Sequence, residues 1–211
     1  MVSDGYKFAA VPLVLAAAAL ACARVRGWGA WFDGAAVFFL LLGLFVLYFF
    51  RDPERQIPSD PRAVVSPADG HVVVVTQEAL DGRAGQRISI FLSIFDVHVN
   101  RAPVSGTIAG LEYRKGSFHG AMFAKASAEN EQNVIRMATE HGDIVFKQIA
   151  GLIARRILFW KQRGETVAIG DRVGMIRFGS RVDVWLPPNA EITVRPGDVV
   201  HGGSSILARW K

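Results

Sequence analysis

Two long apolar segments fill most of the first fifty residues and limit what this part of the chain can form. Phe8–Ala23 and Gly34–Phe50 are sixteen and seventeen residues long and contain no charged side chain. A helix that crosses a bilayer needs roughly 20 apolar residues, so each segment is slightly short. The pattern predicts membrane association, and we favour a helical hairpin that turns at Ala23–Gly27.

Two other arrangements of these segments compete with the hairpin. A secretory signal peptide is disfavoured, because Lys7 is the only Lys or Arg before the first segment and the second segment follows closely. One spanning helix with a second, shallow segment is an alternative. The orientation stays open, since Arg24 and Arg26 lie in the predicted turn while Arg51 and Arg55 follow the second segment.

The charge of the chain agrees with a membrane partner. The formal net charge is +5, and the Lys and Arg residues are scattered, without the basic runs and interleaved aromatics of a nucleic-acid-binding protein. A basic protein with an apolar anchor is attracted to anionic lipid headgroups. The single cysteine, Cys22, excludes an internal disulfide and a cysteine-rich metal site.

The remainder of the chain divides into a linker and a β domain. Residues 51–62 contain three prolines and six charged residues, which indicates a stiff linker after the hairpin of residues 1–50. Residues 63–211 consist of short β-branched runs separated by Gly, Pro, Asp or Asn, without room for crossover helices. The expected runs are 64–76, 88–99, 106–113, 133–139, 143–150, 173–178, 182–187 and 191–195.

The fold class predicted from these runs is mainly β (α+β), an antiparallel domain similar to barrel-sandwich and hybrid-motif folds. Such a fold does not define a function. Gln148–Gly164 is the exception to the pattern, because its apolar residues fit helical spacing and would also fit one long buried strand. Both readings stay open for this segment.

Familiar catalytic and metal motifs are missing from the sequence. The five histidines form neither HExxH nor HxH, which argues against zinc. There is no GxSxG, GxxxxGK[ST] or GxGxxG. Of the Gly-Ser pairs in the chain, two in its C-terminal part remain to be explained, Gly179–Ser180 and Gly203–Ser204.

Four motifs in a fixed order carry a family resemblance. They are PADG at Pro67–Gly70, FLSIFDVHVNRAPV at Phe91–Val104, KASAENEQNVI at Lys125–Ile135, and GMIRFGSRVD at Gly174–Asp183. Each motif alone is weak, but together and in this order they resemble the phosphatidylserine decarboxylase proenzymes in their short bacterial and archaeal form.

The resemblance implies an enzyme without metal or external cofactor. Members of this family cut their own chain before a serine and convert that serine to a pyruvoyl group, which forms a Schiff base with phosphatidylserine and yields phosphatidylethanolamine. The segment Gly174–Ser180 is similar to the family pattern G-x-F-K-x-G-S-T, with Arg181 in place of Thr. We therefore predict cleavage between Gly179 and Ser180, into a β chain of residues 1–179 and an α chain of residues 180–211.

The two Gly-Ser pairs are expected to differ in role. A glycine before the serine admits the bent backbone that lets Ser180 Oγ approach the carbonyl of Gly179. Gly203–Ser204 lacks the upstream glycine and basic residue of the pattern. It fits a small-residue turn before the last strand.

The resemblance also supplies candidate catalytic residues. His98 and Asp69 are expected to act as base, as a histidine oriented by a carboxylate. The family pattern has a second histidine where this chain has Arg101, so the base for self-cleavage stays open between His98 and His119. Asn130, Arg101 and His119 are further candidates for contacts with the substrate.

Partners and location follow from the same resemblance. The expected partners are a phospholipid substrate, the membrane and the two chains of one proenzyme, with a homo-oligomer left open and no nucleic acid. The expected location is the inner membrane, with the catalytic domain in the cytoplasm. Apolar surface near Phe118–Phe123 or Leu152–Trp160 is expected to admit the diacylglycerol part of the lipid. The alternative is a non-catalytic, membrane-anchored adaptor of the hybrid-motif type, which leaves DVHVNR and GMIRFGS unexplained.

Overall fold

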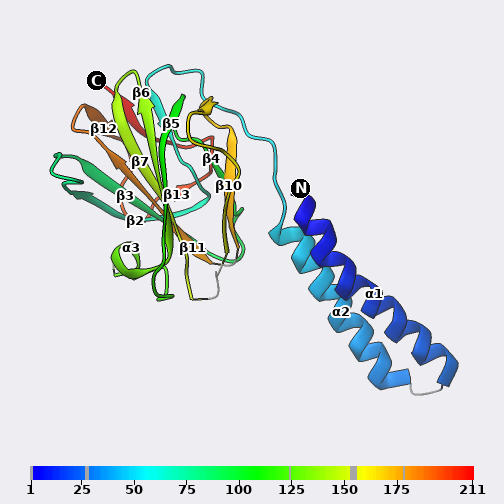
Figure 1. Cartoon of the computed structure of the whole chain (residues 1–211). Helices are drawn as coiled ribbons and strands as arrows, with labels where there is room; N and C mark the ends of the chain where they lie inside the picture. The colour runs from blue at the N-terminus through cyan, green and yellow to red at the C-terminus, as the bar shows by residue number, and fades with distance from the viewer. Residues whose placement is uncertain (1, 27–28, 124, 153–155, 178) are drawn as a thin grey trace. The chain divides into compact units, whose positions relative to one another are not determined.

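The computed structural model describes residues 2–26, 29–123, 125–152, 156–177 and 179–211. The chain forms two compact units, Met1–Pro53 and Glu54–Lys211, which are described separately below. Figure 1 shows the first unit as helices and the second as a β structure.

The first unit is a pair of antiparallel helices, α1 (Ser3–Arg26) and α2 (Gly29–Phe49) (Figure 1). The helices approach closely at Gly43, where a Cβ would lie 2.6 Å from Leu13 Cδ2. At the open end, the Val2 N–H donates to the Phe50 carbonyl over 3.1 Å, and the rings of Phe8 and Phe50 stack at 5.6 Å. The predicted helical hairpin is therefore confirmed.

Four of the five residues of the predicted turn are helical, and the fifth, Gly27, lies outside the described residues. Residues 23–26 continue α1 instead of forming a turn. The helical hydrogen bonds outweigh the mixed composition here, because alanine and arginine are both good helix formers.

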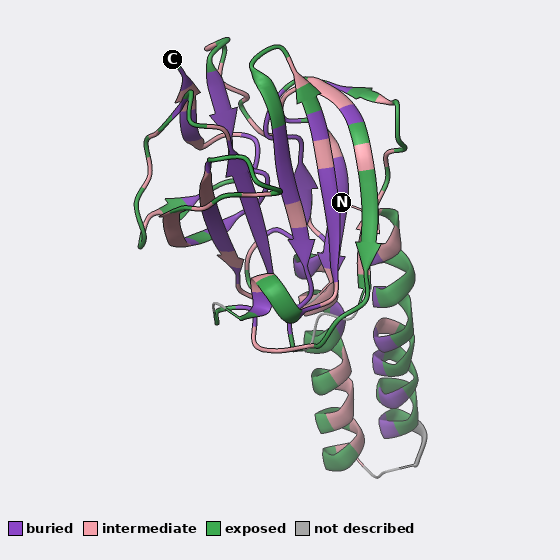
Figure 2. Cartoon of the chain, turned by 60° about the vertical axis from the view of Figure 1, so that its left-hand side comes forward, coloured by how far each residue is buried: buried purple, intermediate pink, exposed green. Residues whose placement is uncertain are grey.

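Both helices are long and apolar enough to cross a membrane by length and composition. Figure 2 shows exposed residues along the length of both helices. Large apolar side chains are among them, since Val14 is 66% exposed and Leu41 is 60% exposed. A pair of helices with this much apolar surface suggests a lipid environment.

The second unit is built from fourteen described strands and one short helix. They are β1 (Ala63–Val65), β2 (Gly70–Gln77), β3 (Gln86–Leu92), β4 (Val99–Arg101), β5 (Gly106–Arg114), α3 (Ala126–Glu129), β6 (Gln132–Thr139), β7 (Gly142–Ile149), β8 (Arg156–Phe159), β9 (Thr166–Val167), β10 (Arg172–Arg177), β11 (Ser180–Leu186), β12 (Ala190–Ile192), β13 (Val199–Val200) and β14 (Ile206–Trp210).

The strand pairings confirm the predicted antiparallel β class. The named strands form an eight-stranded sheet in the order β13-β2-β3-β11-β7-β6-β5-β9, and two three-stranded sheets, β1-β14-β12 and β4-β10-β8. Every pairing between these strands is antiparallel. Each of the eight predicted runs contains a strand or part of one.

The core lies against one face of the large sheet. Strand β11 runs between β3 and β7, and its alternate residues Val182, Val184 and Leu186 are buried in the main apolar cluster together with Ile90 and Phe146. Figure 2 shows the buried residues running through the middle of the strands. Removal of this apolar surface from water is the main force that holds the strands in register.

Gln148–Gly164 forms neither the single helix nor the single long strand that its sequence allowed. Strand β7 ends at Ile149, and β8 occupies Arg156–Phe159. Between them, the chain leaves the sheet and passes Gly151, where a Cβ would overlap the Gly179 carbonyl oxygen. Ile153, Ala154 and Arg155 lie outside the described residues.

The Pro-rich segment is in part docked on the β unit. Arg55 forms an ion pair with Asp69 at 2.7 Å, and Glu54 forms one with Arg172 at 2.8 Å. Further along, Asp60 pairs with Arg209 at 2.9 Å. The second part of this segment is therefore held by side-chain contacts and is not a free spacer.

Candidate active site

The Gly179–Ser180 pair lies where β10 passes into β11. Two pairings fix its surroundings. Ser180 pairs with Leu92 on β3, and Met175 of β10 pairs with Val99 on β4. The segment 93–98, which joins β3 to β4, is therefore brought against the turn that contains Gly179, although the two segments are about eighty residues apart in the chain.

His98 is fully buried at this junction. The Gly179 N–H donates to His98 Nε2 over 3.2 Å, and His98 Nδ1 lies 3.0 Å from the carbonyl oxygen of Asp96. Because Nε2 accepts a hydrogen bond, the ring proton is assigned to Nδ1 and is donated to Asp96. The unprotonated nitrogen, which is the one that can act as a base, faces the Gly179–Ser180 segment.

Ser180 is buried, and its Oγ has no hydrogen-bond partner among the residues that the structure describes. A buried hydroxyl without a partner costs about 1–3 kcal/mol and needs an explanation. Ser127 Oγ is another such hydroxyl among the described residues, so it is the position beside His98 that distinguishes Ser180. The preceding Gly179 has a φ of +61°, in the left-handed region that favours glycine. The backbone thus bends immediately before a buried serine with an unused hydroxyl.

The carbonyl group of Gly179 packs directly on Gly151. A Cβ on Gly151 would overlap the Gly179 carbonyl oxygen, so only glycine fits at this position. Asn130 fixes the neighbouring backbone, because its Nδ2 donates to the carbonyls of Ala150 and His119, each over 2.8 Å, and its Oδ1 accepts the His119 N–H over 2.9 Å. Gly151 was missed at the sequence level, although a glycine that interrupts an apolar run could have indicated a close backbone approach.

Asp69 belongs to a different group of contacts. Its carboxylate pairs with Arg55 at 2.7 Å and accepts the Gly202 N–H over 2.8 Å, and His201 Nδ1 lies 3.5 Å away. The carboxylate that we expected to orient His98 is therefore bonded elsewhere, and the Asp96 carbonyl takes that place. The reason is the turn at the start of β2, which directs Asp69 toward Arg55 and the turn before β14.

The second Gly-Ser pair lies in that turn before β14, as its sequence predicted. Gly203 also has a positive φ, +80°, and its N–H donates to the Ser66 carbonyl over 2.7 Å. The Ser204 N–H donates to the His201 carbonyl over 3.1 Å. These backbone bonds close a compact turn and give the pair a structural role.

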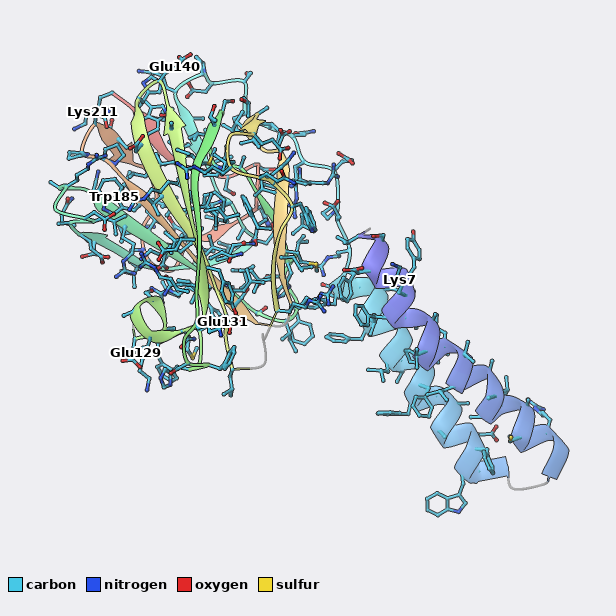
Figure 3. The ribbon with its side chains drawn as sticks, in the orientation of Figure 1. Lys7, Glu129, Glu131, Glu140, Trp185 and Lys211 are labelled. Carbon is cyan, nitrogen blue, oxygen red and sulfur yellow. The ribbon has the colours of Figure 1, made fainter. Side chains whose placement is uncertain are left out.

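The other candidate residues occupy two places. Arg101 is buried, donates from NH1 to the Gly170 carbonyl over 3.0 Å, and packs against Gly203 in the neighbourhood of Asp69. His119 Nε2 lies 2.9 Å from Glu129 on α3, whose position at one end of the β unit is visible in Figure 3. Asn130 already donates both amide hydrogens to backbone carbonyls. Contacts of these three residues with a substrate stay predictions.

A largely apolar pocket of 330 Å³ opens beside the Gly179–Ser180 pair. Its lining residues come from the end of β3, the turn before α3, the segment after β7 and the bend at Gly179. They are Phe91, Ser93, Ile94, Gly120, Ala121, Met122, Phe123, Leu152 and Gly179. The pocket gives a ligand with an apolar part a place next to the bend.

The opposite face of β11 carries buried charges. Arg181 Nε donates to Asp183 over 2.8 Å, and Arg87 lies 3.5 Å from the same carboxylate. Lys147, on β7, is opposite Asp183. Burial lowers the pKa of the Lys147 ammonium from its usual value, and the Asp183 carboxylate opposes this shift. Strand β11 is thus held by its pairing with β3 and β7 and by the charged contacts on its outer face. None of these contacts requires the peptide bond before Ser180.

The described residues contain no group of three or more His, Cys, Asp or Glu side chains that could hold a metal ion. The fold and the site together define an antiparallel β protein with an apolar helical hairpin and a buried Gly-Ser bend beside a histidine.

Comparison with known proteins agrees with this class. The sequence profile of the phosphatidylserine decarboxylase family matches residues 42–208. A phosphatidylserine decarboxylase proenzyme of Solibacter usitatus is 52% identical over 193 residues, which cover 90% of this chain and 92% of the relative. The proenzyme of Burkholderia ambifaria is 46% identical over 209 residues, covering 97% and 94%, and that of Desulfotalea psychrophila is 47% identical over 176 residues, covering 81% and 82%. The chain belongs to the phosphatidylserine decarboxylase family.

Proposed function

We propose that this chain is a proenzyme that cleaves itself between Gly179 and Ser180, and that the mature enzyme decarboxylates phosphatidylserine to phosphatidylethanolamine through a pyruvoyl group at residue 180. The family and the proenzyme names of its relatives support the reaction class. The observation that carries the assignment to this bond is the buried Ser180 hydroxyl, without a partner among the described residues, next to a left-handed glycine whose N–H is bound by His98.

The first step of self-cleavage is an attack by Ser180 Oγ on the carbonyl carbon of Gly179. The Oγ–C bond forms, the C–N bond breaks, and the amide becomes an ester with a free amine on residue 180. His98 Nε2, which accepts the Gly179 N–H, is the base that an observed contact places at this segment. The packing of the Gly179 carbonyl on Gly151 restricts the direction from which the hydroxyl can approach.

The second step removes the ester. A base takes the α-proton of residue 180, the Cβ–Oγ bond breaks, and Gly179 leaves as a carboxylate. The remaining dehydroalanine reacts with water and releases ammonia, which produces the pyruvoyl group. His98 is the candidate for this proton transfer too, whereas the contacts of Asp69 are with Arg55 and the Gly202 N–H and not with His98.

Residue 180 is well suited to hold such a group. It starts a central strand, it is fully buried, and it adjoins the apolar pocket at Gly179. A pyruvoyl group supplies an electrophilic carbonyl that binds the substrate amine and withdraws electrons as the carboxylate is lost. His98 can hold a proton at Nε2 close to this position, and the apolar walls of the pocket limit access of water.

The remaining features fit a lipid substrate. The helical hairpin would keep the enzyme at a membrane. We place the enzyme at the inner membrane, with the β unit in the cytoplasm. The α chain would stay bound after cleavage, because β11 pairs with β3 and β7 of the β chain.

The test is an intact mass measurement of the purified full-length protein under denaturing conditions. We expect fragments of residues 1–179 and 180–211, the second lighter by one ammonia than a serine-terminated peptide. Borohydride reduction with phosphatidylserine should add the substrate amine to the small fragment. A cut after Gly203 would move the site to the other serine, and an uncut chain without decarboxylase activity would contradict the proposal.

A further inference from the structure

Four large apolar side chains that line the pocket at Gly179, or follow a lining residue in the chain, are exposed. Phe95 is 60% exposed, Met122 59%, Phe123 57% and Leu152 65%. They come from three separate segments of the chain, the link between β3 and β4, the turn before α3, and the segment after β7. We call these four residues the apolar rim.

The apolar rim is continuous with the pocket. Met122, Phe123 and Leu152 line the pocket together with Gly179, and Phe95 follows Ile94, which lines it as well. A molecule in the pocket beside Gly179 therefore contacts residues of the rim.

Water is an unfavourable environment for this surface. Full burial of a single Phe, Leu or Met side chain is worth about 1.5–3 kcal/mol, and the rim leaves more than half of each of its four side chains uncovered. Clustered apolar side chains at a protein surface mark a site for a ligand, another protein or a membrane.

The charges beside the rim favour a membrane. Lys125 is exposed and follows Phe123 by two positions, and Arg156 is exposed and follows Leu152 by four. Apolar side chains flanked by cations match an interface with acyl chains below and anionic headgroups above. Two carboxylates near the rim in the chain already have partners, since Asp96, next to Phe95, accepts the Ser93 N–H over 2.7 Å, and Glu129, at the end of α3, pairs with His119 at 2.9 Å. The same chain also carries two helices that can cross a membrane by length and composition.

We propose that the apolar rim inserts into the lipid interface, so that a phospholipid passes from the bilayer into the pocket beside Gly179 without crossing water. The identity of this phospholipid as substrate rests on the proposed function, whereas insertion of the rim does not. The hairpin alone would tether the β unit, and the rim would direct the pocket to the bilayer surface.

Insertion is tested with fluorescent probes in the full-length protein. In a Cys22→Ser background, single cysteines replace Phe123, Leu152 or Val199 and are labelled with bimane. Val199 is the control, because it is also 60% exposed but lies on β13, at the edge of the sheet and outside the rim. The labelled proteins are placed in nanodiscs of phosphatidylcholine and phosphatidylglycerol that contain a lipid-linked quencher.

Quenching at positions 123 and 152, with little at 199, is the expected result. Equal quenching, or no quenching, at all three positions would overturn the insertion. Insertion would also be overturned if positions 123 and 152 were shielded from a soluble quencher but not reached by the lipid-linked one, because the rim would then bind protein. Because these nanodiscs contain no phosphatidylserine, the outcome does not depend on decarboxylase activity.

The passage of substrate is tested with Phe95→Ser, which changes the rim outside the pocket lining. We expect decarboxylation of phosphatidylserine in vesicles to fall about tenfold, the equivalent of roughly 1.4 kcal/mol, while the rate on soluble dihexanoyl phosphatidylserine and self-cleavage stay unchanged. Val199→Ser should change none of the three.

Equal losses on both substrates would place the effect of Phe95 inside the catalytic unit and overturn the proposed passage. Failure of the proposed function gives a different pattern, since the wild-type protein would then act on neither substrate while the probe experiment remained informative.

Discussion

The Gly-Ser pairs at Gly179 and Gly203 have the same two residues and similar glycine conformations but different surroundings. Gly179 and Gly203 both have a positive φ, at +61° and +80°. Ser180 starts a central strand and is buried with an unused hydroxyl, whereas Ser204 is partly exposed in a turn closed by backbone hydrogen bonds. The bent glycine is thus shared by a candidate cleavage site and an ordinary turn, and the buried serine beside His98 is what separates them.

The largest expected effect comes from removing each hydroxyl in turn. Ser180→Ala should abolish self-cleavage and decarboxylation, because the attacking oxygen is gone. Its fold should be retained or slightly stabilised, since a buried hydroxyl without a partner is removed. Ser204→Ala should cleave like the wild type. Intact mass measures cleavage of both variants, and thermal melting measures their stability. Cleavage of Ser180→Ala between residues 179 and 180 would refute the assignment of Ser180 as the attacking residue.

Removal of the base should have the next largest effect. We expect His98→Gln to slow self-cleavage by about 10²–10⁴-fold, the usual contribution of a positioned general base. His201→Gln, near the other Gly-Ser pair, is the control and should cleave normally. The rate is followed as the appearance of the two fragments after synthesis in a cell-free system. If the two variants cleave at the same rate, His98 is not the base.

The packing of the Gly179 carbonyl can be disturbed from the opposite side. Gly151→Ala places a methyl group where that oxygen lies, and a displacement of this kind costs up to about 10²-fold in rate. Gly110→Ala is the matched control, because its Cβ would meet only Arg136 side-chain atoms at 3.5 Å. Circular dichroism checks that both variants fold. Normal cleavage of a folded Gly151→Ala protein would show that the carbonyl position does not limit the reaction.

Loss of the ion pair of Asp69 should lower the free energy of unfolding. Asp69→Asn removes one partner of a largely buried ion pair with Arg55, which typically costs about 3–5 kcal/mol. Asp60→Asn breaks the more exposed pair with Arg209, which should cost about 0.2–1 kcal/mol. Urea unfolding in detergent, followed by tryptophan fluorescence, measures both free energies of unfolding. Equal losses would mean that burial of the Asp69 pair has no energetic consequence.

The smallest effect concerns pH and the strand that follows Ser180. Burial lowers the pKa of Lys147 in the folded protein, so between this pKa and the unfolded value of about 10.4 the unfolded chain binds more protons. The free energy of unfolding should therefore rise with pH in this alkaline window. Lys147→Met should lose this part of the pH dependence, as measured by urea unfolding at pH 8 and pH 10. An unchanged slope would contradict the assigned shift.

Much of the fold was predictable because its signals are local. The eight β-branched runs with turn residues between them became strands, and the two apolar segments became the helices of a hairpin. Local signals failed where a distant segment intervened. Gln148–Gly164 had helical spacing, but Gly151 packs on Gly179 and the chain leaves the sheet there. The helix end at Arg26 was also missed, because helix hydrogen bonding extends through residues that resemble a turn.

The candidate site was predictable only in part. The order of the motifs identified the family and directed attention to Ser180, His98 and Asp69, and the chain's relatives agree with that family. Cleavage at Gly179–Ser180 stays a prediction. The expected pairing of Asp69 with His98 failed, because the partner of a side chain depends on which turn faces it and not on its position in a motif.

The sequence by itself determined an apolar hairpin, an antiparallel β unit and the family, since composition, alternation and ordered motifs are properties of neighbouring residues. The tertiary structure alone decided which Gly-Ser pair has a buried, unused hydroxyl, that Asp96 and not Asp69 contacts His98 Nδ1, and that Gly151 and the apolar rim lie beside the bend. The physical reason is strand register, which brings together residues about eighty positions apart and buries one serine while leaving the other at the surface.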